Sequence, residues 1–157
     1  MGFVLDAAEA QEWIAADARN AEVVFPYLNG EDLNSRPDMS ASRWVIDFND
    51  RPEEQAAEYE LPYARILETV KPERQKLRPD GSYVMRTPLP ERWWQYGEKR
   101  PALRSAIASL PEVLVIAIVS KSVMPMRVPT GQVFSNKLDI FATASFSDQA
   151  VLLSLIH

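Results

Sequence analysis

The sequence has no cysteine, and its only histidine is the last residue, His157. Without cysteine, neither a disulfide nor a thiolate metal site can form. Without an internal histidine, this chain cannot assemble a Ser-His-Asp triad, a histidine general base or a multi-histidine metal site. These two absences argue against most hydrolase chemistries.

Glycine and long apolar runs are also scarce. The five glycines are too scattered for a phosphate-binding loop or a dinucleotide-binding fingerprint. The longest apolar run, VLVIAIV at residues 113–119, falls far short of the ~20 residues that span a bilayer, and it predicts a buried strand. The opening residues lack the basic start and apolar centre of a signal peptide. We therefore expect a cytoplasmic protein without a membrane partner.

Charge is distributed unevenly along the chain, whose net charge is -5. Residues 1–70 hold 15 acidic and 5 basic residues, whereas residues 71–104 hold 9 basic and 4 acidic residues. Residues 105–157 hold 3 of each. Such asymmetry indicates a side that faces a polyanion, although a solvated helical face gives the same pattern.

Hydrophobic patterning predicts an α+β protein, with helices in the N-terminal two thirds packed on a mostly antiparallel sheet formed largely by the C-terminal third. We expect helices at residues 6–20 (capped by Asp6 and stopped near Asn20), 51–60, 61–77 (interrupted at Pro72), 100–110 and 147–157. We expect strands at residues 22–28 (broken at Pro26), 42–48 (half-buried), 112–120, 122–128, 132–136 and 137–143, and a tight turn at Asp80-Gly81. The last helix stops in mid-pattern, which is typical of a fragment of a longer chain, although a natural helix docked into the core would end in the same way.

Residues 26–37, PYLNGEDLNSRP, combine an Asn-Gly pair with two acids and a polar run. Glu31 and Asp32, together with Asp38 or Asp47, could supply the clustered carboxylates that a hard cation such as Mg²⁺ prefers. Nothing in their spacing specifies a coordination geometry. The favoured interpretation is a turn whose acidic side chains face water.

Two Pro-Asp pairs, Pro37-Asp38 and Pro79-Asp80, match the first half of a PD-(D/E)xK nuclease pattern. The second half requires an acid two residues before a lysine. Glu98-Lys99-Arg100 has the wrong spacing and residue type. We interpret both pairs as loop residues and expect no cleavage by this segment.

Residues 91–101, ERWWQYGEKRP, interleave three aromatic residues with basic ones. Such residues can stack on bases while they neutralise phosphates. Large aromatic residues also fill protein cores. We expect one of Trp93 and Trp94 to lie inside and the flanking bases to lie outside.

Residues 119–131, VSKSVMPMRVPTG, place polar and basic side chains at a strand boundary. Arginine and lysine pair with guanine, and serine can serve either kind of base edge. A plain solvent-facing hairpin is the alternative.

Together these segments resemble the target-recognition domain of MmeI-like enzymes, which are single-chain type II restriction-modification proteins, and of their adenine-specific DNA methyltransferase relatives. The matching stretches follow the order that such proteins show: residues 26–48 (PYLNGEDLNSRPDMSASRWVIDF), 70–76 (VKPERQK), 91–107 (ERWWQYGEKRPALRSAI), 119–122 (VSKS) and 128–136 (VPTGQVFSN). Residues 28–33 also look like the Leu-x-Gly-x-Asp-Leu phrase that opens the specificity region of TaqI-like adenine methyltransferases.

The resemblance implies a parent enzyme whose preceding domain binds S-adenosylmethionine and methylates the exocyclic amine of adenine. Its Asn-Pro-Pro-Tyr/Phe motif and glycine-rich cofactor loop do not occur here. We therefore expect no catalytic residue, no metal and no cofactor in this chain, and neither methylation nor cleavage by it alone. Residues 1–20 would be a helix or linker from the missing catalytic domain, and residues 21–157 the recognition domain. The expected partners are double-stranded DNA and the methyltransferase domain of the same parent chain.

A recognition domain must grip phosphates and read base edges. We assign phosphate contact to Arg36, Arg43, Lys71, Arg74, Arg92, Lys99 and Arg100, and base readout to Ser120, Lys121, Ser122 and Arg127. The alternative is a protein–protein interaction module, which the negative net charge and the aromatic pairs also suit.

Overall fold

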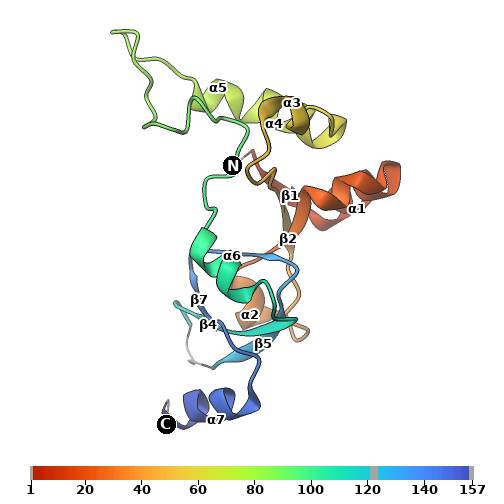
Figure 1. Cartoon of the computed structure of the whole chain (residues 1–157), viewed down its shortest axis with the longest axis vertical. Coiled ribbons are helices and arrows are strands. Elements are labelled where there is room, and N and C mark those ends of the chain that lie inside the picture. The colour runs from red at the N-terminus through yellow and green to blue at the C-terminus, as the bar shows by residue number, and fades with distance from the viewer. Residues whose placement is uncertain (1, 121–123, 156–157) are drawn as a thin grey trace. The chain divides into compact units, whose positions relative to one another are not determined.

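The computed structural model describes residues 2–120 and 124–155 (Figure 1). Two compact units make up the chain, and each is built from two separate stretches. The first unit consists of Met1–Phe25 and Trp44–Lys99, and the second of Pro26–Arg43 and Arg100–His157. Residues 26–43, which include the PYLNGEDLNSRP motif, thus leave the first unit and contribute to the second.

The first unit combines short strands with most of the helices. Its elements are β1 (Val4–Asp6), α1 (Ala7–Ala16), the 3-10 helix η1 (Ala18–Glu22), the start of β2 (Val24–Leu28), nearly all of β3 (Arg43–Ile46), α3 (Glu53–Ala56), α4 (Glu60–Thr69) and α5 (Lys71–Arg74). Strand β3 lies between β1 and β2. Val45 and Ile46, and Asp47 and Phe48 after them, are all buried. The expected half-buried alternation at residues 42–48 was wrong, because Val45 and Asp47 are buried as completely as Ile46 and Phe48 and successive side chains of a strand point to opposite faces.

Helix α1 begins as predicted, with the Asp6 side chain accepting a hydrogen bond from the Glu9 N–H at 2.8 Å. It ends at Ala16, earlier than the expected stop near Asn20. The reason is local: the Asp17 side chain accepts from the Arg19 N–H at 3.0 Å and so caps a new 3-10 turn. Asn20 is buried in this turn, and its Nδ2 donates to the Trp13 carbonyl at 2.8 Å.

The predicted interruption at Pro72 is confirmed, since α4 ends at Thr69 and α5 begins at Lys71 with the proline in its first turn. After α5 the chain leaves the body of the first unit as an extended arm (Figure 1), defined here as residues 76–89. Its base is closed by a hydrogen bond from Gln75 Nε2 to the Pro90 carbonyl at 3.1 Å. The predicted turn at its tip is confirmed, because Gly81 has a φ of 84°.

The second unit contains the end of β2, α2 (Gly30–Ser35), α6 (Pro101–Ile107), β4 (Glu112–Ala117), β5 (Met126–Pro129), β6 (Val133–Phe134), β7 (Leu138–Phe141) and α7 (Phe146–Leu155). Strand β4 is the centre of an antiparallel sheet of order β5-β4-β7, with Val113 opposite Val128 and Val115 opposite Ile140. The core of the unit comprises Leu28, Leu33, Ile107, Val113, Val115, Ala117, Val128, Phe134 and Leu138.

The α+β class is confirmed, but strand β2 differs from expectation. It continues through Pro26 and then pairs in parallel with β6, Tyr27 lying opposite Val133. Proline removes one N–H donor but keeps a φ that an extended strand accepts, so it need not end a strand. Among the described residues, no helix is both long enough and apolar enough to cross a membrane.

Candidate nucleic-acid interface

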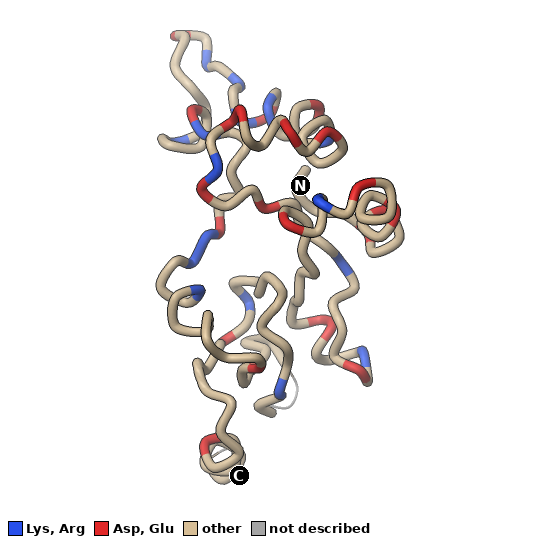
Figure 2. The backbone as a smooth tube through the Cα atoms, turned by 45° about the vertical axis from the view of Figure 1, so that its right-hand side comes forward, with Lys and Arg blue, Asp and Glu red and all other residues tan. Residues whose placement is uncertain are grey.

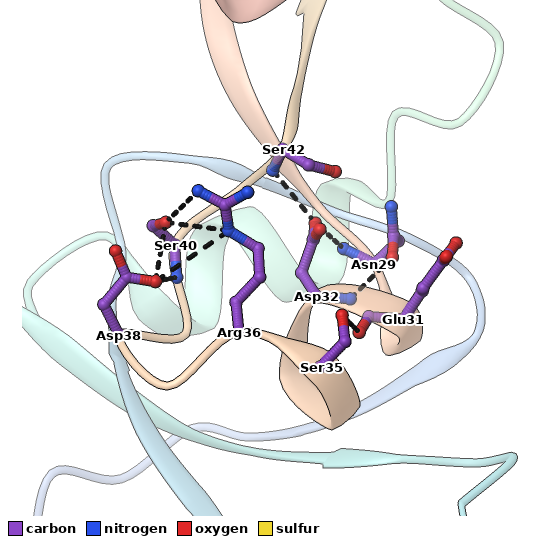
Figure 3. Close-up of polar contacts among 8 residues, drawn as sticks. All are labelled: Asn29, Glu31, Asp32, Ser35, Arg36, Asp38, Ser40 and Ser42. Carbon is purple, nitrogen blue, oxygen red and sulfur yellow. Dashed lines mark hydrogen bonds and ion pairs between the residues drawn. The ribbon is translucent and has the colours of Figure 1, made fainter.

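The PYLNGEDLNSRP motif contains the whole of helix α2, and its Asn29 caps that helix (Figure 3). Asn29 Oδ1 accepts a hydrogen bond from the Asp32 N–H at 3.0 Å, and Asp32 Oδ2 accepts from the Asn29 N–H at 3.4 Å. This reciprocal pair is a capping box, which satisfies two backbone donors that the first turn of a helix leaves open. The Asn-Gly pair therefore starts a helix and does not form the expected turn.

Asp32 is buried, with an exposed fraction of 2%. Its Oδ2 also accepts a hydrogen bond from the Ser42 N–H at 3.2 Å, which ties the end of residues 26–43 to their start (Figure 3). The interpretation that both acids face water is correct for Glu31, which is exposed, and wrong for Asp32. Asp32 is enclosed because backbone N–H groups on two sides of the loop need an acceptor.

The other acids proposed for a cation site have local roles. Asp38 Oδ1 accepts hydrogen bonds from the Ser40 N–H at 3.1 Å and the Ser40 hydroxyl at 2.8 Å. These bonds, the backbone one first, hold the pKa of Asp38 below its ordinary value. Asp47 is buried in the first unit, where its Oδ1 accepts from the Asn49 N–H at 2.8 Å. Within residues 2–120 and 124–155, no group of three or more Asp, Glu or His side chains could hold a metal ion.

Arg36 follows α2 and lies on the surface of the same loop. Its Nε and Nη2 donate to the Ser40 hydroxyl at 3.1 and 2.9 Å, and its Nε lies 3.8 Å from Asp38 Oδ1. With 44% of its side chain exposed, Arg36 can still present one edge of the guanidinium to an anion.

Asn34, on the same helix, contacts the segment that follows β4. Its Nδ2 donates to the Val119 carbonyl at 3.2 Å, and its Oδ1 accepts from the Ser120 hydroxyl at 2.8 Å. Both ends of one amide thus hold the first residues of the VSKS stretch. Helix α2 approaches β4 closely enough that a Cβ on Gly30 would lie 3.5 Å from that of Ala117.

These contacts bring two of the predicted motifs together within the second unit. Sequence reasoning missed Asn34, and no local signal could have revealed it, because its partners lie 85 and 86 positions away. Lys121 and Ser122, the neighbouring readout candidates, lie outside the described residues.

Arg127, the last readout candidate, lies on β5 and anchors α7. Its Nη1 donates to the Ala144 carbonyl at 2.6 Å, and its Nη2 donates to Gln149 Oε1 at 3.1 Å. The guanidinium also lies 4.1 Å from the centroid of the Phe146 ring. Only 16% of the side chain is exposed. In this conformation its hydrogen-bonding groups serve the packing of the second unit.

Three cations of the first unit are also engaged in its fold. Arg74 Nη1 donates to the carbonyls of Trp93 and Gln95 at 3.1 and 2.7 Å, and burial lowers the pKa of its guanidinium below the ordinary value. The Lys71 ammonium lies 5.0 Å from the Trp93 ring centroid. The Lys99 ammonium donates to Asp50 at 2.5 Å and to Gln95 Oε1 at 2.7 Å.

The aromatic residues of the ERWWQYGEKRP stretch belong to the core of the first unit. Trp93 is 2% and Tyr96 6% exposed. Trp94 is half-buried, and its Nε1 donates to the Arg51 carbonyl at 2.9 Å. The expectation that one tryptophan lies inside is confirmed. The buried rings of Trp93 and Tyr96 do not present a stacking surface to a base.

The remaining predicted cations lie at the surface or beside it. Arg100 is half-buried before α6, where its backbone adopts a left-handed conformation (φ 42°) and its Nη1 donates to the Ser135 carbonyl at 3.3 Å. Arg43 and Arg92 are exposed. In the part of the chain that the structure describes, the basic side chains without a hydrogen bond, ion pair or ring contact are those of Arg43, Lys76, Arg86, Arg92 and Lys137. Lys76, Arg86 and Lys137 were not individually assigned phosphate contact, because nothing in the sequence distinguishes a free cation from a paired one.

The comparisons with known proteins add one likeness. No family model matches the chain, and no curated protein matches it. A solved structure, that of the type IIL restriction-modification enzyme MmeI in complex with DNA, is similar with a TM-score of 0.60 and 15% sequence identity. The match covers 99% of this chain and 19% of the MmeI chain. The chain therefore has the fold of a segment that makes up about a fifth of a restriction-modification enzyme.

Proposed function

We propose that this chain is the sequence-specific DNA-recognition domain of an adenine-specific, S-adenosylmethionine-dependent DNA methyltransferase of a restriction-modification system. It would position double-stranded DNA for a separate catalytic domain of the same parent chain. One observation carries the proposal: the likeness to MmeI, which was solved with DNA, extends over 99% of this chain but occupies only 19% of that enzyme. A match of this kind is expected of one domain within a larger protein.

The exposed cations support the proposal. A protein gains affinity for DNA by neutralising phosphates with lysine and arginine side chains. An exposed cation that makes no contact within the protein can do so without breaking an internal interaction. Arg43 and Arg92 meet this condition, and Arg36 meets it in part. Figure 2 shows several basic positions along residues 76–99 of the first unit. We therefore place phosphate contact first on Arg43 and Arg92, with Arg36, Lys71, Lys99 and Arg100 contributing through the donors that their internal contacts leave open.

The geometry around Asn34 supports the choice of the readout segment. Recognition residues are commonly carried on loops that a rigid scaffold holds in place. Here the scaffold is β4 with α2 packed against it, and the loop begins at the two residues that Asn34 holds. We place base readout on Ser120 and on the adjacent Lys121 and Ser122. Arg127 remains a candidate for base readout. To contact a base edge, its guanidinium would have to give up its contacts with Gln149 and Phe146 of α7.

The test is DNA binding and methylation by the full-length protein. It should bind duplex DNA with a strong salt dependence and, given S-adenosylmethionine, should methylate adenine within one defined sequence. Arg92→Ala should weaken binding to all sequences about equally and reduce the slope of log K against log salt by about one. Arg19→Ala is the control, because Arg19 is an exposed cation that is already paired with its neighbour Asp17. Its loss should leave the slope unchanged. Binding that does not respond to salt would contradict the proposal.

A second candidate function, a protein–protein interaction module, is favoured by helix α7. Phe146 is 77% and Leu155 75% exposed, and no described residue of this helix is buried. Exposed apolar surface of this kind suits a protein interface. Tight binding to a protein subunit, combined with weak and salt-insensitive binding to DNA, would favour this candidate over the first.

A further inference from the structure

The arm, residues 76–89, holds a small ribbon whose shape is set by its own backbone. Leu77 and Tyr83 lie opposite each other in an antiparallel bridge. The Arg78 N–H donates to the Ser82 carbonyl at 2.7 Å, and the Val84 N–H donates to the Lys76 carbonyl at 2.9 Å. At the tip, Asp80 Oδ1 accepts from the N–H and the hydroxyl of Ser82 at 2.9 and 2.6 Å. These contacts are all local, so the ribbon needs no packing against the core to keep its turn.

The ribbon nevertheless carries apolar side chains of which about half remains exposed. Leu77 is 56%, Tyr83 41% and Val84 45% exposed. Residues directly opposite each other in an antiparallel pair lie on the same face, so Leu77 and Tyr83 form one apolar surface. An isolated two-stranded ribbon is marginally stable in water, and its exposed apolar face gains from a partner that buries it.

The charge of the arm indicates the kind of partner. Lys76 and Arg86 are exposed and have no side-chain contact within residues 2–120 and 124–155, and Arg78 makes only a 3.4 Å contact to the Val84 carbonyl. The one acid of the arm, Asp80, is occupied by Ser82. The arm is thus basic within a chain of net charge -5, which favours a partner that is both anionic and partly apolar.

We infer that the arm is a two-stranded ribbon that enters the major groove of duplex DNA. This inference rests on the proposed function. The major groove, about 12 Å wide, admits a two-stranded ribbon, and thymine methyl groups offer an apolar surface within it. Leu77 and Tyr83 would lie against the base edges. Lys76 and Arg86, with long flexible side chains, would reach the phosphates along the groove walls.

The experiment compares two arm variants of the full-length protein on a short labelled duplex over a range of salt concentrations. Lys76→Ala/Arg86→Ala should reduce the slope of log K against log salt by about 1.8, about 0.9 for each phosphate contact. Leu77→Ser/Tyr83→Ser should weaken binding on the order of tenfold. The slope should stay unchanged, because these two side chains neutralise no phosphate and so do not alter the number of counterions released on binding.

The same duplex with every thymine replaced by uracil tests the groove contact directly. Wild-type protein should bind it more weakly than the thymine duplex, and Leu77→Ser/Tyr83→Ser should show a smaller difference between the two. Equal differences in wild type and variant would overturn the groove assignment. Within the described residues, the side chains of Lys76 and Arg86 make no contact, so we expect both substitutions to preserve folding. Arg19→Ala controls for the loss of one exposed charge.

The binding data separate an error in the proposed function from an error in the arm inference. If wild-type protein shows no salt-dependent binding to either duplex, the proposed function itself is wrong. If wild type binds and Arg92→Ala lowers the slope while both arm variants behave as wild type does, the arm inference alone is overturned.

Discussion

Ser120 donates its hydroxyl hydrogen to Asn34 Oδ1 at 2.8 Å across 86 positions of sequence. The same amide donates to the Val119 carbonyl at 3.2 Å. A single side chain on α2 therefore holds the start of the loop that follows β4, where we place base readout.

Replacing Asn34 with alanine should remove both contacts and release this loop. We expect relaxed discrimination at one base position of the methylated sequence, by about 1–3 kcal/mol, because a loop that is not held offers several geometries to the base. The salt slope of binding should stay unchanged. Sequencing of methylated sites in a randomised duplex pool measures the first effect, and a salt titration measures the second.

The control for Asn34→Ala is Ser35→Ala, on the same helix, because the Ser35 hydroxyl donates to the Glu31 carbonyl of its own turn. Ser35→Ala should leave the methylated sequence unaltered. If Asn34→Ala also leaves it unaltered, the loop is not positioned by this amide.

Replacing Asp32 with alanine should lower the free energy of unfolding by about 1–3 kcal/mol, because the partly buried N–H groups of Ser42 and Asn29 would both lose an acceptor. Chemical denaturation measures this change. Glu31→Ala, which alters an exposed neighbour, should change stability by no more than about 0.5 kcal/mol. Added Mg²⁺ should not stabilise the wild type; a clear stabilisation that Asp32→Ala abolishes would instead point to a cation site.

Arg74 and Arg92 should respond in opposite ways to the same substitution. Arg74→Ala leaves the carbonyls of Trp93 and Gln95 without their donor, so we expect a loss of about 1.5–3 kcal/mol of stability. Arg92→Ala should leave stability within about 0.5 kcal/mol and reduce the salt slope of DNA binding by about 0.9. Denaturation and salt titration of both variants provide the comparison. A lowered slope for Arg74→Ala in a fully folded protein would show that this residue also reaches a phosphate.

Arg127→Ala should loosen α7, because the guanidinium contacts Ala144, Gln149 and the Phe146 ring. Limited proteolysis should then cut residues 144–150 faster than in the wild type. We also expect a change in the base tolerated at one position, at a cost of about 1–3 kcal/mol. Gln149→Ala removes one α7 contact but keeps the guanidinium, so it should loosen the helix without altering the methylated sequence. An unaltered sequence in Arg127→Ala would leave this residue with a packing role only.

The Asp80 carboxyl should titrate below the ordinary range of an aspartate. Hydrogen bonds from the Ser82 hydroxyl and then from its N–H lower the pKa of Asp80. Because the pKa is lower in the folded turn than in the unfolded chain, the turn gains stability above the ordinary aspartate pKa and loses it as pH falls through the lowered one. An NMR titration of Asp80 should show the low value, and Ser82→Ala should move it back towards the ordinary range.

Much of the secondary structure could be predicted because its causes are local. Asp6 caps α1, Pro72 separates α4 from α5, and Gly81 supports the turn at the tip of the arm. Each depends on a residue's own backbone preference or on neighbours within one turn. Alternating and periodic apolar residues were likewise enough to establish the α+β class.

The contacts of individual polar residues were decided only by the tertiary structure. From the sequence, Asp32 resembles a surface acid, but in the structure it accepts a hydrogen bond from the Ser42 N–H. Arg127 likewise resembles an unpaired cation, but in the structure it donates to the Ala144 carbonyl beside α7. Asn34 gains its role from partners 85 and 86 positions away. Periodicity reports which face of an element is apolar, but whether a polar side chain is free or engaged depends on which distant segment the fold brings within hydrogen-bonding distance.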